Sequence, residues 1–297
     1  MKYKVVASHC CLLGEGPIWD ADTKTIYWVD ILNGNIHGFG TTENVHQTMQ
    51  VNEMVCAVAL CTNGDFLAAL KSGLAFINRE RGEVKLLHHP EIHLPENRFN
   101  DGKCDPAGRF WIGTMSLSEK AGAGSLYMIE SDLSYSLKIE GVTISNGMAW
   151  SPDHKIFYYI DTPTFQVVAY DYDIDTGEIT NRKLAINIPE KEGFPDGMTI
   201  DTEGMLWIAH WDGWHVVRWN PVTGEKLLSI PLPAARITSC TFGGDDLQDL
   251  YITSASIGLT ERQHEEQPLA GALFVVKNCG FQGMETAVFN YQQNKNV

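Results

Sequence analysis

The chain has 297 residues, of which 44% are hydrophobic, 20% charged and 10% aromatic, and its formal net charge is −15 at pH 7. This is the composition of a globular protein, and the length is sufficient for one large core. Because nucleic acids and anionic membranes attract positively charged surfaces, the acidic excess argues against both as partners.

The N-terminal residues and the cysteines favour a cytoplasmic protein. Residues 5–13 follow Lys2 and Lys4 as a signal peptide would, but the apolar run is short and is interrupted by His9, so we predict a strand there. No stretch approaches the ~20 apolar residues that span a bilayer. The seven cysteines are odd in number and form no CxxC pair, which argues against disulfides and zinc–thiolate sites and favours buried, reduced thiols.

Six units of similar design follow one another along the chain. Each has a short apolar run, a turn, a strand rich in β-branched and aromatic residues, and a further strand about ten residues later. The turns lie at residues 20–22, 63–64, 107–108, 152–153, 203–204 and 243–246. The strands after them lie at 26–29, 66–69, 110–113, 156–159, 206–209 and 250–253. The next strands include 73–77, 125–129, 167–172, 215–219 and 272–276.

The spacing of these units predicts the fold. They recur about every 40–50 residues, which is typical of four-stranded propeller blades. We therefore predict an all-β protein in which residues 1–297 form a single domain, a six-bladed β-propeller of four-stranded antiparallel blades. An open ring would expose two sheet edges, so residues 3–7 and 287–291 are expected to close it. A β-sandwich or a two-domain β protein is the alternative.

Three similar phrases at residues 14–17, 145–148 and 195–198 each place an oxygen-bearing side chain at the same point. The innermost strand of a propeller blade lines the central channel, and residues just before it lie at one mouth. Glu15, Asn146 and Asp196 would meet there, where two carboxylates and one amide suit a hard divalent cation with open coordination positions. Taken singly, Glu15 and Asp196 are more often turn residues than ligands.

The entry to the third blade predicts contacts with a polar ligand. Arg98 offers a planar fork of donors and Asn100 offers both a donor and an acceptor, which suits a polyhydroxylated ligand or a carboxylate. The alternative is that Arg98 pairs with Asp101 and braces the turn. Residues 116–123 form a polar loop that is either a lid carrying Glu119 to the substrate or a plain surface loop.

As a set, these motifs resemble the regucalcin (senescence marker protein)/gluconolactonase/luciferin-regenerating-enzyme family. The matching phrases lie at residues 14–17, 97–103, 113–115, 145–151 and 195–198, and residues 153–161 look like the regucalcin branch. The resemblance implies a six-bladed propeller with one divalent ion (Ca²⁺ or Zn²⁺, with Mg²⁺ or Mn²⁺ as alternatives) at the channel mouth. It implies Glu15, Asn146 and Asp196 as ligands, Arg98 and Asn100 as substrate contacts, and Asp196 as general base. Loop 116–123 departs in length from the mammalian pattern, so the resemblance does not carry over to Glu119.

The function that follows is metal-dependent hydrolysis of a sugar (aldono-)lactone to the aldonic acid, as in gluconolactonases. In this hypothesis the cation polarises the lactone carbonyl, while Asp196, or a water on the ion, provides the base or nucleophile. A regucalcin-like calcium-binding or regulatory protein without physiological catalysis is the alternative, and a plain interaction propeller is a third. The sequence leaves the lactone, the ion and the oligomeric state open.

Overall fold

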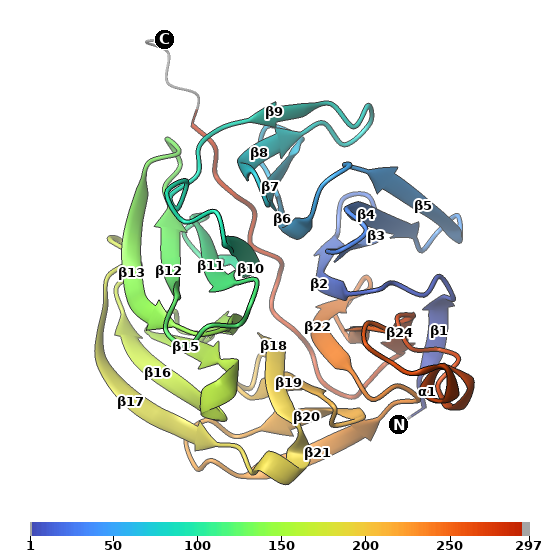
Figure 1. Ribbon diagram of the computed structural model, residues 1–297. Helices are drawn as coiled ribbons and strands as arrows, with labels where there is room; N and C mark the ends of the chain where they lie inside the picture. The colour runs from blue at the N-terminus through green and yellow to red at the C-terminus, as the bar shows by residue number, and fades with distance from the viewer. Residues whose placement is uncertain (1, 293–297) are drawn as a thin grey trace.

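The structure is a computed structural model that describes residues 2–292. Its strands form six four-stranded antiparallel sheets, arranged as blades around a central axis (Figure 1). Blade one contains β2 (Gly14–Asp20), β3 (Thr25–Asp30), β4 (Asn35–Gly40) and β5 (Val45–Gln50). Blade two contains β6 (Val55–Leu60), β7 (Phe66–Leu70), β8 (Gly73–Ile77) and β9 (Val84–Leu86). Blade three contains β10 (Asn97–Cys104), β11 (Phe110–Ser116), β12 (Gly124–Ile129) and β13 (Tyr135–Val142).

The other three blades continue around the ring, and the predicted all-β, six-bladed propeller is confirmed. Blade four contains β14 (Ser145–Trp150), β15 (Ile156–Asp161), β16 (Gln166–Tyr172) and β17 (Ile179–Asn187). Blade five contains β18 (Phe194–Ile200), β19 (Leu206–Trp211), β20 (His215–Trp219) and β21 (Lys226–Pro231). Blade six contains β22 (Ile237–Gly243), β23 (Asp249–Ser254), β24 (Leu273–Val276) and, from the other end of the chain, β1 (Lys4–Ala7).

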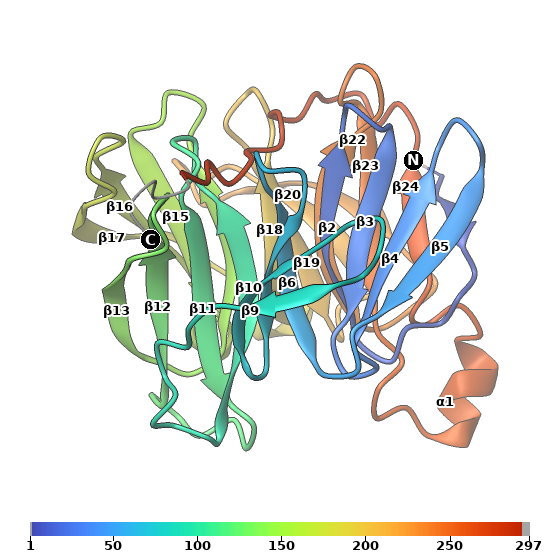
Figure 2. The same cartoon turned by 90° about the horizontal axis from the view of Figure 1, so that it is seen from above.

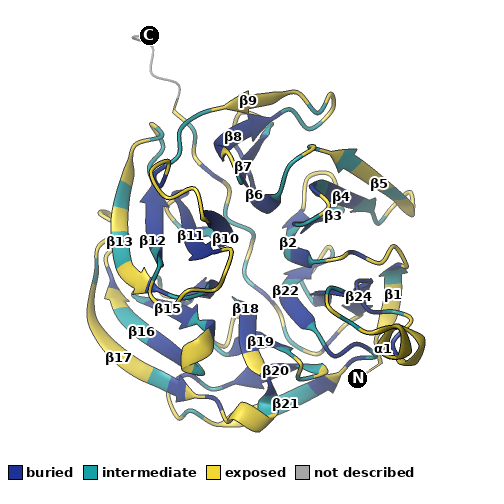
Figure 3. Cartoon of the chain, in the orientation of Figure 1, coloured by how far each residue is buried: buried dark blue, intermediate teal, exposed yellow. Residues whose placement is uncertain are grey.

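Burial falls from the inside of each blade to the outside. The inner strands, such as β6 and β14, are buried along their whole length, whereas the outermost strands, such as β9, are largely exposed (Figure 3). The aromatic-rich strands predicted from the sequence are the second strands of the blades, where both faces pack against neighbouring blades. The exposed fourth strands of blades one to five carry no strong apolar pattern, and the sequence did not define them.

One half of the predicted ring closure is correct and the other is wrong. The N-terminal strand β1 pairs with β24 and completes blade six, as residues 3–7 predicted. Residues 287–291 do not join that blade. They belong to a C-terminal segment that crosses the axis at the end where the inner strands finish (Figure 1). There Phe289 N–H donates to Leu60 O and Asn290 N–H donates to Gly108 O, so the C-terminal segment covers that end and is anchored to blades two and three.

This covered end lies over a cavity of about 410 Å³ inside the channel, lined by residues such as Lys103, Trp150 and Thr241. Phe289 is fully buried against the core of blade two, so the apolar residues of the C-terminal segment are used for packing against the ring. That packing explains why their pattern resembled a strand. The opposite end of the channel, where the inner strands begin, is the mouth.

Of two similar buried polar networks, one joins blades three and four and the other lies within blade five. Asp105 accepts hydrogen bonds from Arg109 Nε at 2.7 Å, Trp111 Nε1 at 2.9 Å and Tyr172 OH at 2.8 Å, the last from blade four. Asp201 likewise accepts from Trp207 Nε1 and from Arg218 Nε. Each Asp thereby satisfies a tryptophan N–H and an arginine that would otherwise be buried without partners.

Little of the described chain is helical. A 3₁₀ turn, η1 (Thr162–Thr164), joins β15 to β16 in blade four, and a second, η2 (Glu190–Glu192), lies in the connection from blade four to blade five. One short helix, α1 (Glu261–Glu266), projects from blade six (Figure 2). Helix α1 was not predicted from the sequence. It is held by a capping box between Thr260 and Gln263. Within residues 2–292, no helix is long and apolar enough to cross a membrane.

Candidate active site

The strand pairing of every blade is irregular where its innermost strand begins. The register shifts fall between Glu15 and Ile18, Val55 and Ala57, Phe99 and Gly102, Asn146 and Met148, Pro195 and Met198, and Ile237 and Ser239. A bulge inserts an extra residue and redirects its side chain. The predicted site residues therefore lie inside the inner strands, at their bulges, rather than just before them as expected from the sequence.

The bulges bring the predicted oxygen ligands together at the mouth. Glu15 of β2, Asn146 of β14 and Asp196 of β18 are all buried. The charge of Glu15 and that of Asp101 both act on the Asp196 carboxyl, and the Asn146 amide is also close to it. Blades one, three, four and five thus contribute side chains to a single cluster. Whether these residues bind an ion or catalyse a reaction stays a prediction.

Ionisation of all the carboxyl groups in the cluster is unfavourable when no cation is bound, because they are buried close together. Burial, and then the neighbouring Asp101 charge, raise the pKa of Glu15 to about 8, although the hydrogen bond from Gly16 N–H acts to lower it. Burial, Glu15 and Asp101 raise the pKa of Asp196 well above its ordinary value. Burial also lowers the pKa of Lys103, while the acids around it oppose that shift. Buried like charges of this kind are relieved by protons or by a cation.

The amide of Asn146 supports the interpretation of the cluster as a cation-binding site. Asn146 Nδ2 donates to Thr162 Oγ1 at 2.9 Å, and Thr162 Oγ1 donates to Pro195 O at 2.8 Å, which fixes the orientation of the amide. Asn146 Oδ1 is buried and accepts no hydrogen bond from the residues that the structure describes. An oriented carbonyl oxygen without a donor, beside two carboxylates, is the donor set that a hard divalent ion prefers. The residues present therefore fit a divalent ion.

Arg98 and Asn100 lie next to this cluster and form one unit. Arg98 Nη1 donates to Asn100 Oδ1 at 2.7 Å and to Phe99 O at 2.8 Å, and Asn100 Nδ2 donates to Ser145 O at 2.8 Å. Asp101 Oδ1 instead accepts from Gly102 N–H at 2.8 Å. Within residues 2–292, Arg98 makes no ion pair with Asp101, so the alternative in which these two residues pair is not observed, and Arg98 braces Asn100 instead.

Glu119 is not part of the buried cluster. It lies exposed in the loop between β11 and β12, on the mouth side, and its backbone N–H donates to Ser116 O. A substrate contact from Glu119 stays a prediction. In blades two and six, the equivalent bulges carry Cys56 and Thr238 rather than acids, and Thr238 Oγ1 donates to Gly14 O.

Sequence reasoning did not assign Thr162 or Lys103 a role at the site. Thr162 lies in η1, which follows β15, whereas Asn146 lies in the preceding strand β14, and no sequence motif includes Thr162. Lys103 Nζ donates to Met198 O at 2.6 Å and its charge acts on Glu15. Its only sequence signal was its place at the end of the phrase 97–103, beside Asn100 and Asp101.

Fold and site together define a class of protein: a six-bladed propeller that holds a buried cluster of acids and amides at the end of the channel where its inner strands begin. The model of the SMP-30/Gluconolactonase/LRE-like region matches residues 13–256, and the chain belongs to this family. It is 40% identical to regucalcin of Danio rerio over 275 residues, which cover 92% of each chain. It is 38% identical to YvrE of Bacillus subtilis, named as a candidate sugar lactone lactonase, over 89% of this chain and 90% of that one.

Solved structures agree with the assignment. A regucalcin from Agrobacterium tumefaciens, described as a calcium-binding protein, superposes with a TM-score of 0.93 at 28% identity and covers 97% of both chains. A luciferin-regenerating enzyme superposes with a TM-score of 0.89 at 30% identity, over 97% of this chain and 99% of that one. The family predicted from the sequence motifs is therefore confirmed.

Proposed function

We propose that the chain is a metal-dependent lactonase that hydrolyses a sugar lactone to the aldonic acid. The observation that carries the proposal is the mouth cluster, where Asn146 Oδ1 is buried with no hydrogen-bond donor among residues 2–292 and shares the cluster with the carboxylates of Glu15 and Asp196. Membership of a family that includes gluconolactonases supports the reaction class.

The residues of the mouth divide into two groups. Glu15, Asn146 and Asp196 would hold the ion, with Ca²⁺ or Zn²⁺ favoured and Mg²⁺ or Mn²⁺ as alternatives for an oxygen-rich site. When bound, the ion supplies Lewis-acid polarisation of an ester carbonyl. Thr162 keeps the Asn146 amide turned so that its oxygen faces the site.

Arg98 and Asn100 form the second group and would orient the sugar. The Arg98 guanidinium has donors left after its bonds to Phe99 O and Asn100 Oδ1, and these suit ring hydroxyls or the carboxylate product. Because Asn100 is held by both Arg98 and Ser145 O, the pair is pre-organised, and little freedom is lost when a substrate binds.

Asp196 is the residue we assign as general base. Its carboxyl is buried, and burial raises its pKa, which strengthens it as a base, whereas a neighbouring cation favours the ionised form. In its ionised form it would take a proton from the attacking water, and the ring oxygen of the lactone would leave as a hydroxyl. Exposed Glu119 is retained only as a rim contact to the sugar.

The proposal is tested by measuring acid release from a panel of aldonolactones against a panel of divalent ions, with and without chelator. We expect turnover that depends on the ion and that falls by several orders of magnitude in Asp196→Asn. The matched control is Asp175→Asn, an exposed turn aspartate at the opposite end of the ring, which should keep full activity. Absence of ion-dependent turnover on every lactone would refute the proposal.

A regucalcin-like calcium-binding protein without physiological catalysis is the second candidate, supported by the identity to regucalcins. Calcium titration of the same variants separates the two. Binding that is lost in Asp196→Asn, with no turnover of any lactone by the native chain, would favour the second candidate.

For either candidate, we propose a cytoplasmic protein whose partner is a small molecule rather than nucleic acid or membrane. The supporting observations are the net charge of −15 and the unpaired state of all seven cysteines, of which only Cys10 is exposed.

A further inference from the structure

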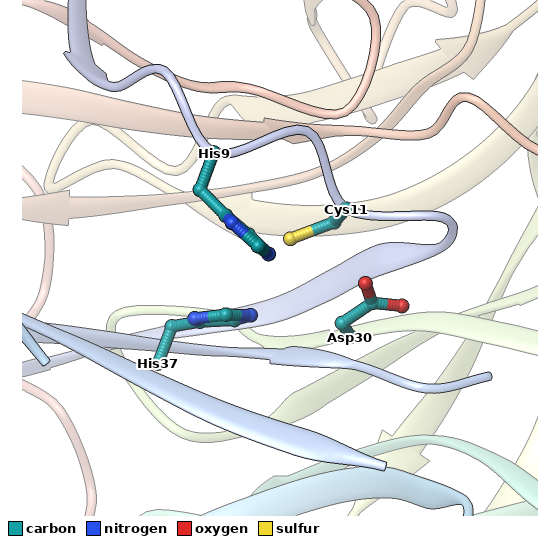
Figure 4. Close-up of side chains that lie close together, drawn as sticks. All are labelled: His9, Cys11, Asp30 and His37. Carbon is teal, nitrogen blue, oxygen red and sulfur yellow. The ribbon is translucent and has the colours of Figure 1, made fainter. Parts of the chain in front are cut away.

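A second cluster of ligand-type side chains lies in blade one, apart from the mouth cluster. His9 and Cys11 belong to the connection between β1 and β2, Asp30 ends β3, and His37 lies in β4 (Figure 4). One donor atom from each of these four residues lies within 4.8 Å of the donor atoms of the other three. The donors are two imidazole nitrogens, one sulfur and one carboxylate oxygen.

Three of the four residues are fixed in place by the fold. The Asp30 carboxylate accepts from Leu12 N–H at 2.9 Å and from Leu13 N–H at 3.1 Å, which holds the connection against blade one. Cys11 is buried, and its Sγ accepts from Trp28 Nε1 at 3.4 Å. The His37 ring stacks on Trp28 with 5.0 Å between ring centroids. The donor atoms of Cys11, Asp30 and His37 are therefore positioned by the fold before any ligand binds.

The unpartnered atom of this cluster is His37 Nε2. His37 is fully buried, yet Nε2 has no hydrogen-bond partner among residues 2–292. Figure 4 shows the tip of its ring directed into the space between Cys11 and Asp30. Its other nitrogen, Nδ1, lies 3.0 Å from Thr48 Oγ1. His46 Nε2 also lies 3.2 Å from Nδ1, so Thr48 Oγ1 or His46 Nε2 can accept a proton carried on Nδ1. In that tautomer Nε2 presents a lone pair to the cluster, which is how a metal-binding histidine is usually oriented.

We propose that His9, Cys11, Asp30 and His37 form a second metal site, for a thiophilic divalent ion of the Zn²⁺ type. A thiolate, two imidazoles and a carboxylate make up a four-coordinate set of the kind that zinc prefers. On binding, the Cys11 S–H bond breaks, a sulfur–metal bond forms, and the proton passes to solvent. The thiolate and the Asp30 carboxylate then balance the charge of the ion in a buried place.

The cluster needs only a small contraction to bind. Zinc bonds of about 2.0–2.3 Å place tetrahedral ligands about 3.3–3.8 Å apart, which is somewhat closer than the 4.8 Å limit of the cluster. His9 is exposed and lies on the connection between two strands, so its side chain can supply that movement.

The proposed site is chemically distinct from the mouth and has a structural consequence. The mouth cluster offers the oxygen donors of Glu15, Asn146 and Asp196, whereas the blade-one cluster combines sulfur, imidazole and carboxylate donors. The connection bearing His9 and Cys11 leads directly from β1, the strand that closes blade six, into blade one. An ion held there would tie the closing strand to the neighbouring blade and stabilise the closed ring.

The test uses Co²⁺ as a spectroscopic stand-in for Zn²⁺ on the full chain. A cobalt–thiolate bond gives a near-ultraviolet charge-transfer absorption that oxygen ligands do not give. We expect this absorption in the native protein and in Glu15→Gln, and its loss in Cys11→Ser. The matched control is Cys10→Ser, since the neighbouring Cys10 is exposed and its sulfur contacts Ser8 O and Pro268 O instead, so that variant should keep the absorption.

A second measurement remains informative if a buried variant folds poorly. His9→Ala changes an exposed side chain, and we expect its Zn²⁺ affinity in the Glu15→Gln background to fall by about 10–100-fold, with loss of the Zn²⁺-dependent rise in melting temperature. The proposal is overturned if native protein shows no thiolate absorption with Co²⁺, if Cys11→Ser retains it, or if His9→Ala binds Zn²⁺ as tightly as its parent.

Discussion

Replacing Glu15 by Gln should stabilise the metal-free protein and destabilise the metal-loaded one. Gln has nearly the same shape, and its carbonyl can still accept the Gly16 N–H that donates to Glu15 Oε2 at 2.7 Å. The substitution removes a negative charge that is buried beside Asp101 and acts on Asp196. The substitution therefore separates the cost of burying a carboxylate from the gain of binding a cation.

The magnitude follows from the pKa of Glu15, which is raised from 4.5 to about 8 in the folded chain. Below pH 4.5 the carboxyl is protonated in both states, and its contribution to stability is fully present. Between pH 4.5 and about 8 only the unfolded state ionises, so each pH unit removes about 1.4 kcal/mol of stability. At pH 8 the metal-free protein should have lost on the order of 4–5 kcal/mol that Glu15→Gln retains.

The assay is urea unfolding at several pH values from 5 to 8, in chelator and in excess Ca²⁺. In chelator, the variant should unfold at higher urea than the native chain, by a margin that grows with pH. In Ca²⁺ at 100 times its Kd the native chain should gain about 2.7 kcal/mol, and the variant far less. A variant that is less stable than the native chain in both conditions, with no dependence on pH, would refute the electrostatic reasoning.

Three other substitutions probe separate parts of the molecule. Arg98→Lys should lower kcat/KM for lactones by about 10–100-fold in steady-state kinetics, because Lys cannot hold Asn100 and a sugar with one planar fork, while Ca²⁺ affinity measured by calorimetry stays unchanged. Asp105→Asn should cost about 3–5 kcal/mol in urea unfolding, because it leaves the buried Arg109 charge without its partner. Phe289→Ala should also cost about 3–5 kcal/mol, because it removes a fully buried ring from the C-terminal segment.

The fold could be predicted because its signal is repeated. The second strand of each blade is packed on both faces, so its aromatic and β-branched residues recur at a fixed spacing, and the structure places all six where the sequence indicated. The C-terminal segment was misassigned because its apolar residues have the spacing of a strand. Phe289 packs beneath the channel instead, and only the three-dimensional position of Leu60 and Gly108 explains that.

The mouth cluster was predictable for a related reason, since its residues occupy equivalent points of repeated units. The blade-one cluster was not, because it follows no repeat. His9 and Cys11 precede the first unit, while Asp30 and His37 lie on different strands and meet through the pairing of β3 with β4. An odd number of cysteines without a CxxC pair argued against a zinc–thiolate site, but that pattern does not reveal a site with a single thiolate.

The six bulges are equivalent in backbone and differ in chemistry, and this asymmetry divides the mouth. Blades one, four and five present the oxygens of Glu15, Asn146 and Asp196, whereas blade two presents Cys56, a small buried residue next to Arg98. Burial raises the pKa of the Cys56 thiol, and the charge of Arg98 partly opposes that rise. Because the Arg98 side chain contacts the buried Cys56 thiol, a longer side chain at position 56 would displace the guanidinium.

Asn100 connects these two halves of the mouth, because it accepts from Arg98 and donates to Ser145 O, the residue next to Asn146. A ligand placed on the blade-two side would therefore be aligned with the proposed ion on the blade-four side through one hydrogen-bonded unit. Under the proposed function, a substitution of Asn100 should disturb ion and sugar together, whereas Arg98 should affect the sugar alone. Specificity among lactones would then reside in blades two and three, and the chemistry in blades one, four and five.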